Sequence, residues 1–306
     1  HRKPEGDEIY YPTSAAGLLS LLARFDYDIV HYHFGGMLTR RVLALATACT
    51  LRPGIKSVLT FHSGGFPSTP QGKATSPNSI AAFVLRRLDG VIVVNQEIAG
   101  FLEKLQVQPR RVRLISPYSA MCDLRTGSLP PELKTFFDTH NPVIISAGQL
   151  EPEYDLPLQI EALGRVLPKF PDAGLLLLGS GGIERDLRVK IESLHLAAHA
   201  LLAGDVPHEA TLEAISRADL LLRTALYDGD SISVREALHV GTPVIASDNA
   251  MRPEGVTLFP QSGLRALVDA IETQLSRSKP QPTHVPADET SLQAVLDFYQ
   301  ELLAAK

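Results

Sequence analysis

The chain is poor in cysteine, has no excess of basic charge and contains no long hydrophobic run. Its 306 residues include two cysteines, Cys49 and Cys122, too few for a disulfide framework and wrongly spaced for a zinc site. Because 29 Lys and Arg face 34 Asp and Glu, no general positive field exists to attract nucleic acid or anionic lipid. The longest apolar stretches, such as residues 173–178, are far shorter than the roughly 20 residues that span a bilayer. With no secretory signal pattern at its start, the sequence favours a cytoplasmic protein without a structural metal.

Short β-branched runs alternate with helical patterns over the first half of the chain. Strands are expected at residues 28–33, 57–61, 90–94 and 112–116, and helices at 38–49, 79–88 and 96–105. Strands and helices in this order predict parallel βαβ units. The alternation stops at residues 117–131, which are rich in Pro, Ser and Thr, and this composition predicts a domain linker.

The same alternation resumes after the linker and predicts a second α/β domain. Strands are expected at residues 142–146, 175–178, 200–203, 219–223 and 243–246, and helices at 156–167, 182–194, 209–217 and 234–240. The run 175–178 is apolar throughout, which is typical of a strand buried on both faces. A last helix at residues 290–303 carries an apolar stripe that must pack on another element. The stripe consists of Leu292, Val295, Leu296, Tyr299 and Leu302.

Length and pattern together favour an α/β protein of two doubly wound, Rossmann-like domains, although a single barrel also fits the length. We place the first domain at residues 1–120, the linker at 121–140, the second domain at 141–285 and the terminal helix at 286–306. Two such domains enclose a cleft, and ligands of such sheets lie beyond the carboxyl ends of the strands. Functional residues are therefore expected in the loops that follow strands.

Residues 227–247 carry the densest functional signal. A strand ends near Arg223, a polar turn containing Gly229 follows, and a helix begins near Ser233. Free backbone N–H groups and the positive end of the helix dipole then face the cleft, which makes this turn an anion site. A plainer interpretation is that Ser233 and Glu236, which have capping-box spacing, only cap the helix, a contribution of about 1 kcal/mol.

The same segment resembles the donor-site signature of the family 4 glycosyltransferases. In that signature two acidic residues, separated by seven others, precede Ala, a helix end and Gly-x-Pro-Val-x-Ala-Ser, which here ends at Ser247. The resemblance implies that Glu236 hydrogen-bonds the nucleotide ribose and that Asp228 contacts the donor sugar. It also implies that backbone amides reach the sugar and the phosphates from five residues, Gly229, Asp230, Ser231, Ile232 and Ser233.

Other segments resemble the same family, whose GT-B fold places two Rossmann-like domains face to face across a cleft. Residues 145–155 and 178–182 are similar to loops of its C-terminal domain, 252–255 to a loop near the donor, and 28–33 and 59–63 to strands of its acceptor side. On this resemblance the donor side adds Gly148, Gln149, Tyr154, Gly179, Arg235 and Glu254. The acceptor side consists of His33, Gly35, Gly36 and Ser63. The terminal helix is expected to cross back to the first domain.

Two features depart from the family pattern. The family places Arg and Lys at the diphosphate, where this chain has Gln149 and Tyr154. Negative charge on a leaving diphosphate must be stabilised by positive groups or oriented dipoles, so other groups must substitute. The candidates are the helix terminus and three arginines, Arg223, Arg235 and Arg252.

Only about 27 residues precede Asp28, so we expect a partial sequence whose first domain lacks the family's opening strands.

The resemblance implies a retaining glycosyltransferase that moves a sugar from a nucleotide diphosphate sugar to an acceptor hydroxyl, with no metal and no further cofactor. A glycan, a lipid-linked group or a small molecule is the expected acceptor, in glycan or polysaccharide biosynthesis, and peripheral membrane contact fits this role. His62, Asp228 and Glu236 are the expected catalytic residues. His62 is expected to line the reacting face, although a histidine at a strand end is often only a hydrogen-bonded residue. His31 and His33 share one face of their strand, and we assign them mainly to packing near the cleft.

Three other functions stay open from the sequence. A nucleotide-sugar epimerase of the GT-B type would convert the donor without an acceptor. A catalytically weakened, glycosyltransferase-like subunit that binds a nucleotide or a partner protein would fit the neutral Gln149 and Tyr154. A periplasmic two-lobed binding protein would fit the two domains but not the lack of an export signal.

Overall fold

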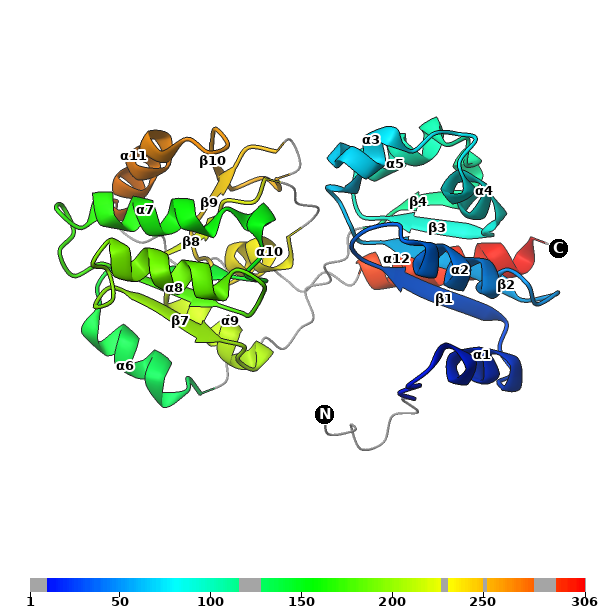
Figure 1. The fold of residues 1–306 in the computed structure, drawn as a ribbon, viewed down its shortest axis with the longest axis horizontal. Helices are drawn as coiled ribbons and strands as arrows, with labels where there is room; N and C mark the ends of the chain where they lie inside the picture. The colour runs from blue at the N-terminus through cyan, green and yellow to red at the C-terminus, as the bar shows by residue number, and fades with distance from the viewer. Residues whose placement is uncertain (1–9, 116–127, 227–230, 250–251, 278–289, 306) are drawn as a thin grey trace.

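The computed structural model describes residues 10–115, 128–226, 231–249, 252–277 and 290–305, which form two α/β lobes. Each lobe is built on one parallel sheet flanked by helices (Figure 1). The first lobe contains a sheet of four strands and the second a sheet of six. The predicted α/β class with two Rossmann-like units is confirmed.

The first sheet has the order β1-β2-β3-β4, so each strand lies next to its predecessor in the chain. Its strands are β1 (Ile29–Phe34), β2 (Lys56–Phe61), β3 (Gly90–Val93) and β4 (Val112–Leu114). The helices of this lobe include α1 (Ala15–Arg24), α2 (Arg40–Cys49), α3 (Pro70–Ala74), α4 (Ile80–Arg87) and α5 (Gln96–Lys104). Thr39, Ser79 and Asn95 start α2, α4 and α5, because each side chain accepts a hydrogen bond from a backbone N–H three residues later. The sequence pattern does not predict α1 or α3.

The second sheet has the order β10-β9-β8-β5-β6-β7. Its strands are β5 (Val143–Ala147), β6 (Gly174–Leu178), β7 (Ala200–Gly204), β8 (Leu220–Arg223), β9 (Val244–Ser247) and β10 (Thr257–Phe259). The chain builds outward from β5 to β7 and then adds β8, β9 and β10 on the other side of β5. The strand order therefore reverses between β5 and β8, and doubly wound sheets bind ligands at such a switch point.

Helices cover both faces of the second sheet. They are α6 (Pro131–Thr139), α7 (Leu156–Val166), α8 (Glu184–Ser193), α9 (His208–Arg217), α10 (Ile232–His239) and α11 (Leu264–Leu275). Buried residues of α7, α8 and α11 form one core with the sheet, and those of α6, α9 and α10 form the other. With both faces covered, the central strands are apolar, as in the Leu175–Leu178 run of β6.

Helix α6 lies within residues 121–140, which the sequence composition assigned to the linker. Leu133 and Phe136 of this helix are buried in the core of the second lobe, so the helix belongs to that lobe. Pro131 occupies its first turn, where proline is well tolerated because no hydrogen bond is lost there. The linker interpretation is thus corrected for residues 131–139, while residues 121–127 lie outside the described part of the chain.

Helix α12 (Thr290–Ala304) ends the chain but packs on the first sheet (Figure 1). Its Phe298, which is 2% exposed, lies in a small core with three residues of the first lobe, Val58, Ile92 and Ile115. A β-carbon on Gly90 would lie 2.7 Å from the Phe298 ring, so this glycine leaves the space that the ring fills. The helix therefore crosses back to the first lobe, as expected.

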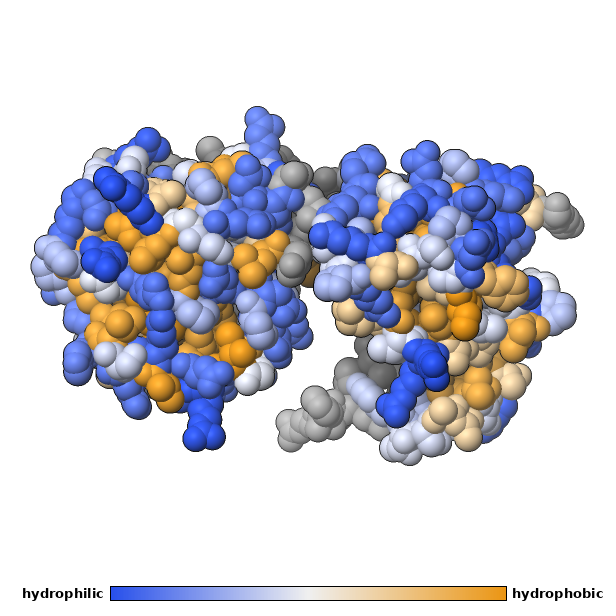
Figure 2. Space-filling view, turned by 45° about the horizontal axis from the view of Figure 1, so that its top comes forward, coloured by the Kyte–Doolittle hydropathy of each residue, from blue (hydrophilic) through white to orange (hydrophobic). Residues whose placement is uncertain are grey.

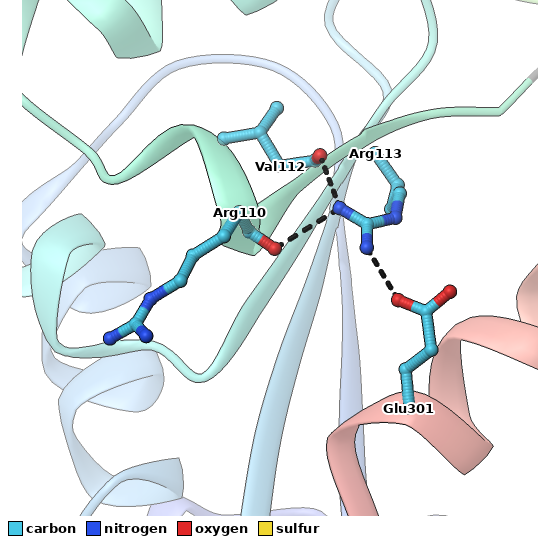
Figure 3. A network of polar contacts seen from close by, with 4 residues as sticks. All are labelled: Arg110, Val112, Arg113 and Glu301. Carbon is cyan, nitrogen blue, oxygen red and sulfur yellow. Dashed lines mark hydrogen bonds and ion pairs between the residues drawn. The ribbon is translucent and has the colours of Figure 1, made fainter. Parts of the chain in front are cut away.

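Arg113 of β4 ties the same helix to the sheet (Figure 3). Its guanidinium forms an ion pair with Glu301 and donates hydrogen bonds to the carbonyl oxygens of Arg110 and Val112, at 3.1 and 3.2 Å. The guanidinium carbon also lies 4.9 Å from the centre of the Phe298 ring, a cation–π contact. One arginine thus contacts both a charged and an aromatic residue of α12.

The apolar stripe predicted for this helix is only partly correct. Val295, Tyr299 and Leu302 pack on the first lobe, whereas Leu292 and Leu296 are 57% and 44% exposed. The deeply buried residue is Phe298, which the pattern did not include. A helix lying on a sheet contacts it along a narrow strip of positions three and four apart, and this strip runs through Phe298.

Candidate active site

An interdomain cavity of about 690 Å³ lies between the two lobes. It is lined by Gly35, Gly36, His62 and Ser63 of the first lobe and by Gln149, Tyr154 and Leu226 of the second, among others. These residues follow β1, β2, β5 and β8, so both sheets direct the carboxyl ends of their strands toward it. The space-filling view shows the recess between the lobes (Figure 2).

The first-lobe wall is formed by two loops that leave the same edge of the sheet. Strands β1 and β2 pair in parallel up to Phe34 and Phe61, so the loops that follow them emerge together. The backbone N–H of Gly36 donates a hydrogen bond to the hydroxyl of Ser63 and joins the two loops. Gly36 has a φ of +89°, a conformation that favours glycine. The structure thus brings the predicted acceptor-side residues Gly35, Gly36 and Ser63 next to His62.

Three histidines, His31, His33 and His62, form a stack beside this wall. The ring centres of His31 and His33 are 4.3 Å apart, which confirms that they share one face of β1. His33 stacks on His62 at 5.2 Å, with a 2.9 Å hydrogen bond between Nδ1 of His33 and Nε2 of His62. One nitrogen donates and the other accepts, so this bond orients the His62 ring at the cavity. His33 is exposed, and its ring packs between those of His31 and His62 beside the cavity.

His31 is held from two sides at the base of the histidine stack. Its Nε2 lies 2.6 Å from the hydroxyl of Thr60, and its Nδ1 hydrogen-bonds the hydroxyl of Tyr299 on α12. Burial, followed by the neighbouring His33 and His62, lowers the pKa of His31 to about 4. Burial, followed by His33, also lowers the pKa of His62. His31 and His62 are therefore neutral imidazoles at neutral pH.

A second-lobe pocket of about 400 Å³ opens at the carboxyl ends of β5 and β6. Its walls include Gly148, Gln149 and Gly179, and Gln149 also lines the interdomain cavity. A β-carbon on Gly179 would lie 1.8 Å from the carbonyl oxygen of Gly148, so the two loops touch through their backbones. Ser180 donates a 2.8 Å hydrogen bond to Asp205 on the far wall. Backbone rather than side chains lines this floor, which lets a ligand approach main-chain groups closely.

Helix α10 begins at Ile232, and its N-cap residue is Ser231. Ser233 lies inside the helix and no side chain caps it, so the capping-box interpretation of Ser233 and Glu236 is wrong. Glu236 is 5% exposed, and its Oε1 lies 2.6 Å from Nε2 of His208, the first residue of α9. A buried carboxylate requires such a partner, and His208 holds it in a defined orientation.

The predicted site residues separate into groups in the structure. The interdomain cavity collects His62, Ser63, Gly35, Gly36, Gln149 and Tyr154, and the second-lobe pocket collects Gly148, Gln149 and Gly179. Ser231, Ile232, Ser233, Arg235 and Glu236 lie at or within α10. Asp228, Gly229 and Asp230 lie outside the described residues. Glu254 is exposed in a turn before β10 and lines none of these cavities.

Two residues gain importance that the sequence did not give them. His208 was not predicted at all, although it is the partner of Glu236. Arg223 was only one of four candidate substitutes for the missing cations, yet it is 9% exposed at the end of β8, with its guanidinium carbon 4.3 Å from the centre of the Tyr154 ring. The available signal was a basic residue that ends the apolar strand Leu220–Arg223.

The chemistry of the described cavities rests on imidazole, carboxylate, hydroxyl, guanidinium and backbone amide groups. Among the residues that the structure describes, no group of three or more His, Cys, Asp or Glu side chains is arranged to hold a metal ion, the histidine stack included. No described helix combines the length and the hydrophobicity needed to cross a bilayer.

Two Rossmann-like lobes facing across such a cavity define a GT-B fold. Anabaena Alr3699/HepE, solved in complex with UDP and glucose, matches with a TM-score of 0.70 at 17% identity, over 94% of this chain and 79% of that chain. Sucrose-phosphate synthase from Thermosynechococcus elongatus also matches with a TM-score of 0.70, at 18% identity, over 97% of this chain and 81% of that chain. These likenesses establish the fold.

Family models divide the chain as the two lobes do. The Glycosyltransferase Family 4 model matches residues 2–117, and the Glycosyl transferases group 1 model matches residues 133–273. The chain belongs to glycosyltransferase family 4.

Curated relatives are glycosyltransferases as well. A phosphatidyl-myo-inositol mannosyltransferase of Mycobacterium tuberculosis is 26% identical over 240 residues, 74% of this chain and 56% of the relative. The uncharacterised glycosyltransferase MJ1059 of Methanocaldococcus jannaschii is 22% identical over 259 residues, 82% of this chain and 63% of the relative. The chain thus spans between about half and two thirds of the length of these relatives.

Proposed function

We propose that this chain transfers a sugar from a nucleotide diphosphate sugar to an acceptor hydroxyl, with retention of configuration at the anomeric carbon. The observation that carries the proposal is the interdomain cavity, where the loop of Gln149 and Tyr154 in the second lobe faces His62 of the first. Gln149 also lines the second-lobe pocket, whose floor is formed by the loops of Gly148 and Gly179. The loops offer backbone groups to a diphosphate, and a neutral imidazole offers a hydrogen bond to a hydroxyl. Membership of family 4 supports the same reaction class.

The nucleotide is assigned to the second-lobe pocket. Glu236, whose Oε1 is held by His208, accepts a hydrogen bond from a ribose hydroxyl, and Gly148 and Gly179 leave room for the nucleotide beside their backbones. The diphosphate then lies at the switch point between β5 and β8, and the sugar projects into the interdomain cavity past Gln149, which lines both spaces. Asp228, Gly229 and Asp230, with Ser231, Ile232 and Ser233, are assigned to the sugar and phosphates.

The first lobe supplies the acceptor side of the reaction. The C1–oxygen bond to the donor phosphate breaks with its electron pair on the phosphate oxygen, and the acceptor oxygen bonds C1 from the same face. The acceptor proton leaves with the diphosphate. His62 stays neutral and orients the acceptor hydroxyl or the donor sugar by a hydrogen bond, while His33 holds its ring. No metal or further cofactor enters this scheme.

The names of similar proteins suggest which donors and acceptors to test first. A uridine diphosphate sugar is supported by Alr3699/HepE, which was solved with UDP-glucose. A lipid-linked or glycan acceptor is supported by the relative named for its action on phosphatidyl-myo-inositol. Both statements concern those proteins, and for this chain they define the first compounds to test.

The test is incubation of the chain with uridine and guanosine diphosphate sugars, with and without inositol phospholipid vesicles or oligosaccharides as acceptors. Release of nucleoside diphosphate together with a new α- or β-linked product of retained configuration is the expected result. Conversion of the donor alone would identify an epimerase instead. The proposal would be overturned if calorimetry showed that none of these nucleotide sugars binds to the chain.

A binding subunit without turnover is the second candidate, and one observation favours it. Gln149 and Tyr154, which face the interdomain cavity, are neutral. Such a subunit would bind nucleoside diphosphates but would not turn over any donor in the presence of any of these acceptors. Binding and turnover measured on the same preparation therefore separate the two candidates.

A further inference from the structure

We infer that Arg223 is the residue that neutralises the diphosphate of the donor, so that the cation of this site comes from the end of β8. The inference rests on the proposed function. It assigns a role to a side chain that the sequence left as one of several substitutes, and three independent contacts of the second lobe support it.

The first support is the place of Arg223 in the sheet. Strands β5 and β8 pair in parallel, with Ile145 opposite Leu221, so Arg223 lies level with Ala147 at the carboxyl edge. Its Nη1 donates a 3.3 Å hydrogen bond to the carbonyl oxygen of Ala147. This edge between β5 and β8 is the switch point of the sheet, where ligands of doubly wound domains bind. Arg223 therefore occupies the expected phosphate position without belonging to a loop.

The second support is the space at Gly148. A β-carbon on Gly148 would lie 2.7 Å from Nη1 of Arg223, and Gly148 has a φ of +151°. The glycine thus lets the guanidinium lie against the loop that also lines the second-lobe pocket. A side chain at residue 148 would displace the guanidinium.

The third support is the way in which β8 holds Tyr154. The guanidinium carbon of Arg223 is 4.3 Å from the centre of the Tyr154 ring, and the hydroxyl of the next residue, Thr224, donates a 2.6 Å hydrogen bond to the carbonyl oxygen of Tyr154. The backbone N–H of Leu226 donates to the carbonyl oxygen of Glu153 at 2.7 Å. Three residues of one strand end thus fix the loop, and the ring keeps the guanidinium in one orientation.

Charge singles out Arg223 among the arginines considered. Among the described residues, no Lys or Arg lines the interdomain cavity or the second-lobe pocket. Arg223 lines a small cavity of about 10 Å³ that shares Gln149 with both of them, and it is the only Lys or Arg among the described residues of that lining. Arg252 lies one strand farther from the switch point, where it donates hydrogen bonds to the carbonyl and hydroxyl oxygens of Ser247 at 3.1 and 3.3 Å. Arg235 lies within α10 rather than at its first residue.

A guanidinium at this position serves the proposed reaction. When the C1–oxygen bond breaks, the electron pair stays on the diphosphate, and the acceptor proton leaves with it. Arg223 donates two parallel hydrogen bonds to phosphate oxygens and stabilises the charge as it develops. The low exposure of the side chain strengthens this interaction, because solvent screens it less.

The test compares diphosphate and monophosphate nucleotides by calorimetry, using UDP, UMP, GDP and GMP with the 306-residue chain. Arg223→Met keeps an unbranched, largely apolar side chain and removes the guanidinium with its charge. It is expected to weaken diphosphate binding by about 10- to 100-fold and to change monophosphate binding by less than about threefold. With a donor in hand, kcat is expected to fall by about 100- to 1,000-fold.

A rescue variant and a control sharpen the test. Tyr154→Lys in the Arg223→Met background places an ammonium beside the vacated position and is expected to restore about a tenth or more of the lost diphosphate affinity. Arg188→Met removes an exposed guanidinium on α8 that pairs with Glu184. This variant is expected to bind both diphosphate and monophosphate nucleotides with wild-type affinity. If Arg223→Met does not fold, Arg223→Lys decides: it is expected to lose diphosphate affinity by about threefold or more while binding the monophosphate normally.

The outcomes separate the inference from the proposed function. A folded Arg223→Met or Arg223→Lys chain with unchanged preference for the diphosphate overturns the inference alone. A wild-type chain that binds none of the four nucleotides overturns the proposed function and the role of Arg223 together.

Discussion

Gly179 lies so close to Gly148 that a β-carbon at residue 179 would be 1.8 Å from the carbonyl oxygen of residue 148. Gly179 also has a φ of +124°, which residues with a side chain rarely adopt. The loops after β5 and β6 can therefore meet only through their main chains. The second-lobe pocket owes its shape to this contact.

Gly179→Ala is expected to destabilise the fold by about 3 kcal/mol or more, because both the backbone strain and the steric overlap must be relieved. Chemical unfolding measures the loss, and nucleotide affinity should fall with it as the floor of the pocket moves. Gly100→Ala is the matched control: Gly100 is in α5 with open space around it, so alanine is expected to stabilise that helix by about 0.5–1 kcal/mol. Equal stability of the two variants would contradict the close approach.

Glu236→Gln is expected to weaken binding of a ribonucleoside diphosphate by about 10- to 100-fold, because a charged hydrogen-bond acceptor is lost. The sharper measurement is the preference for the ribose over the 2′-deoxyribose form of the same nucleotide, which should shrink in the variant. Glu184→Gln, on the exposed surface of α8, should leave that preference as it is. An unchanged preference in Glu236→Gln would remove Glu236 from the ribose site.

Phe298→Ala is expected to cost about 3–5 kcal/mol, because it empties the small core that α12 forms with the first sheet. Loss of protection of α12 in hydrogen exchange would localise the effect. Leu292→Ala, on the exposed side of the same helix, should change stability by less than about 0.5 kcal/mol. If both variants behave alike, the helix does not dock through Phe298.

Stability is expected to fall on mild acidification because of His31. Its pKa is about 4 in the folded chain against an ordinary value of 6.5, so between these values the unfolded chain binds more protons. The contribution of His31 is therefore complete above about pH 6.5 and is lost as the pH falls toward 4. Urea midpoints at several pH values should show a shallower decline for His31→Gln than for the wild type. The exposed His195→Asn should retain the wild-type slope.

Local patterns were sufficient for most of the fold. Strands β1 to β9 and most of the helices were predicted within a few residues, because apolar runs and helical periods are short-range signals. Strand β10 and helix α11, which buries Leu267 and Ile271, were not predicted. Helix α6 was missed because the prolines around residue 131 indicated a linker. Its Leu133 and Phe136 are buried against residues that are distant in the sequence, and no local pattern shows such contacts. Helix α10 starts at Ile232, within one residue of the start expected near Ser233, with Ser231 at its N-cap and no side-chain capping bond.

The site was less accessible from sequence because its key contacts are long-range. Glu236 was expected to contact a ligand, but its partner His208 lies 28 residues earlier and reaches it only when α9 packs on α10. Arg223 and Tyr154 meet because β5 and β8 are neighbours in the sheet, a consequence of strand order that no local spacing reveals. The roles predicted for His62, Asp228 and the other site residues stay predictions until ligands are measured.

Because α12 belongs to the first lobe, that lobe is assembled from two stretches of chain separated by the whole second lobe. Production of residues 10–115 alone would leave the surface around Val58 and Ile92 bare, and such a fragment should aggregate or bind added α12 peptide. A permuted gene that joins residues 290–305 directly to the first lobe would instead yield an autonomous acceptor half.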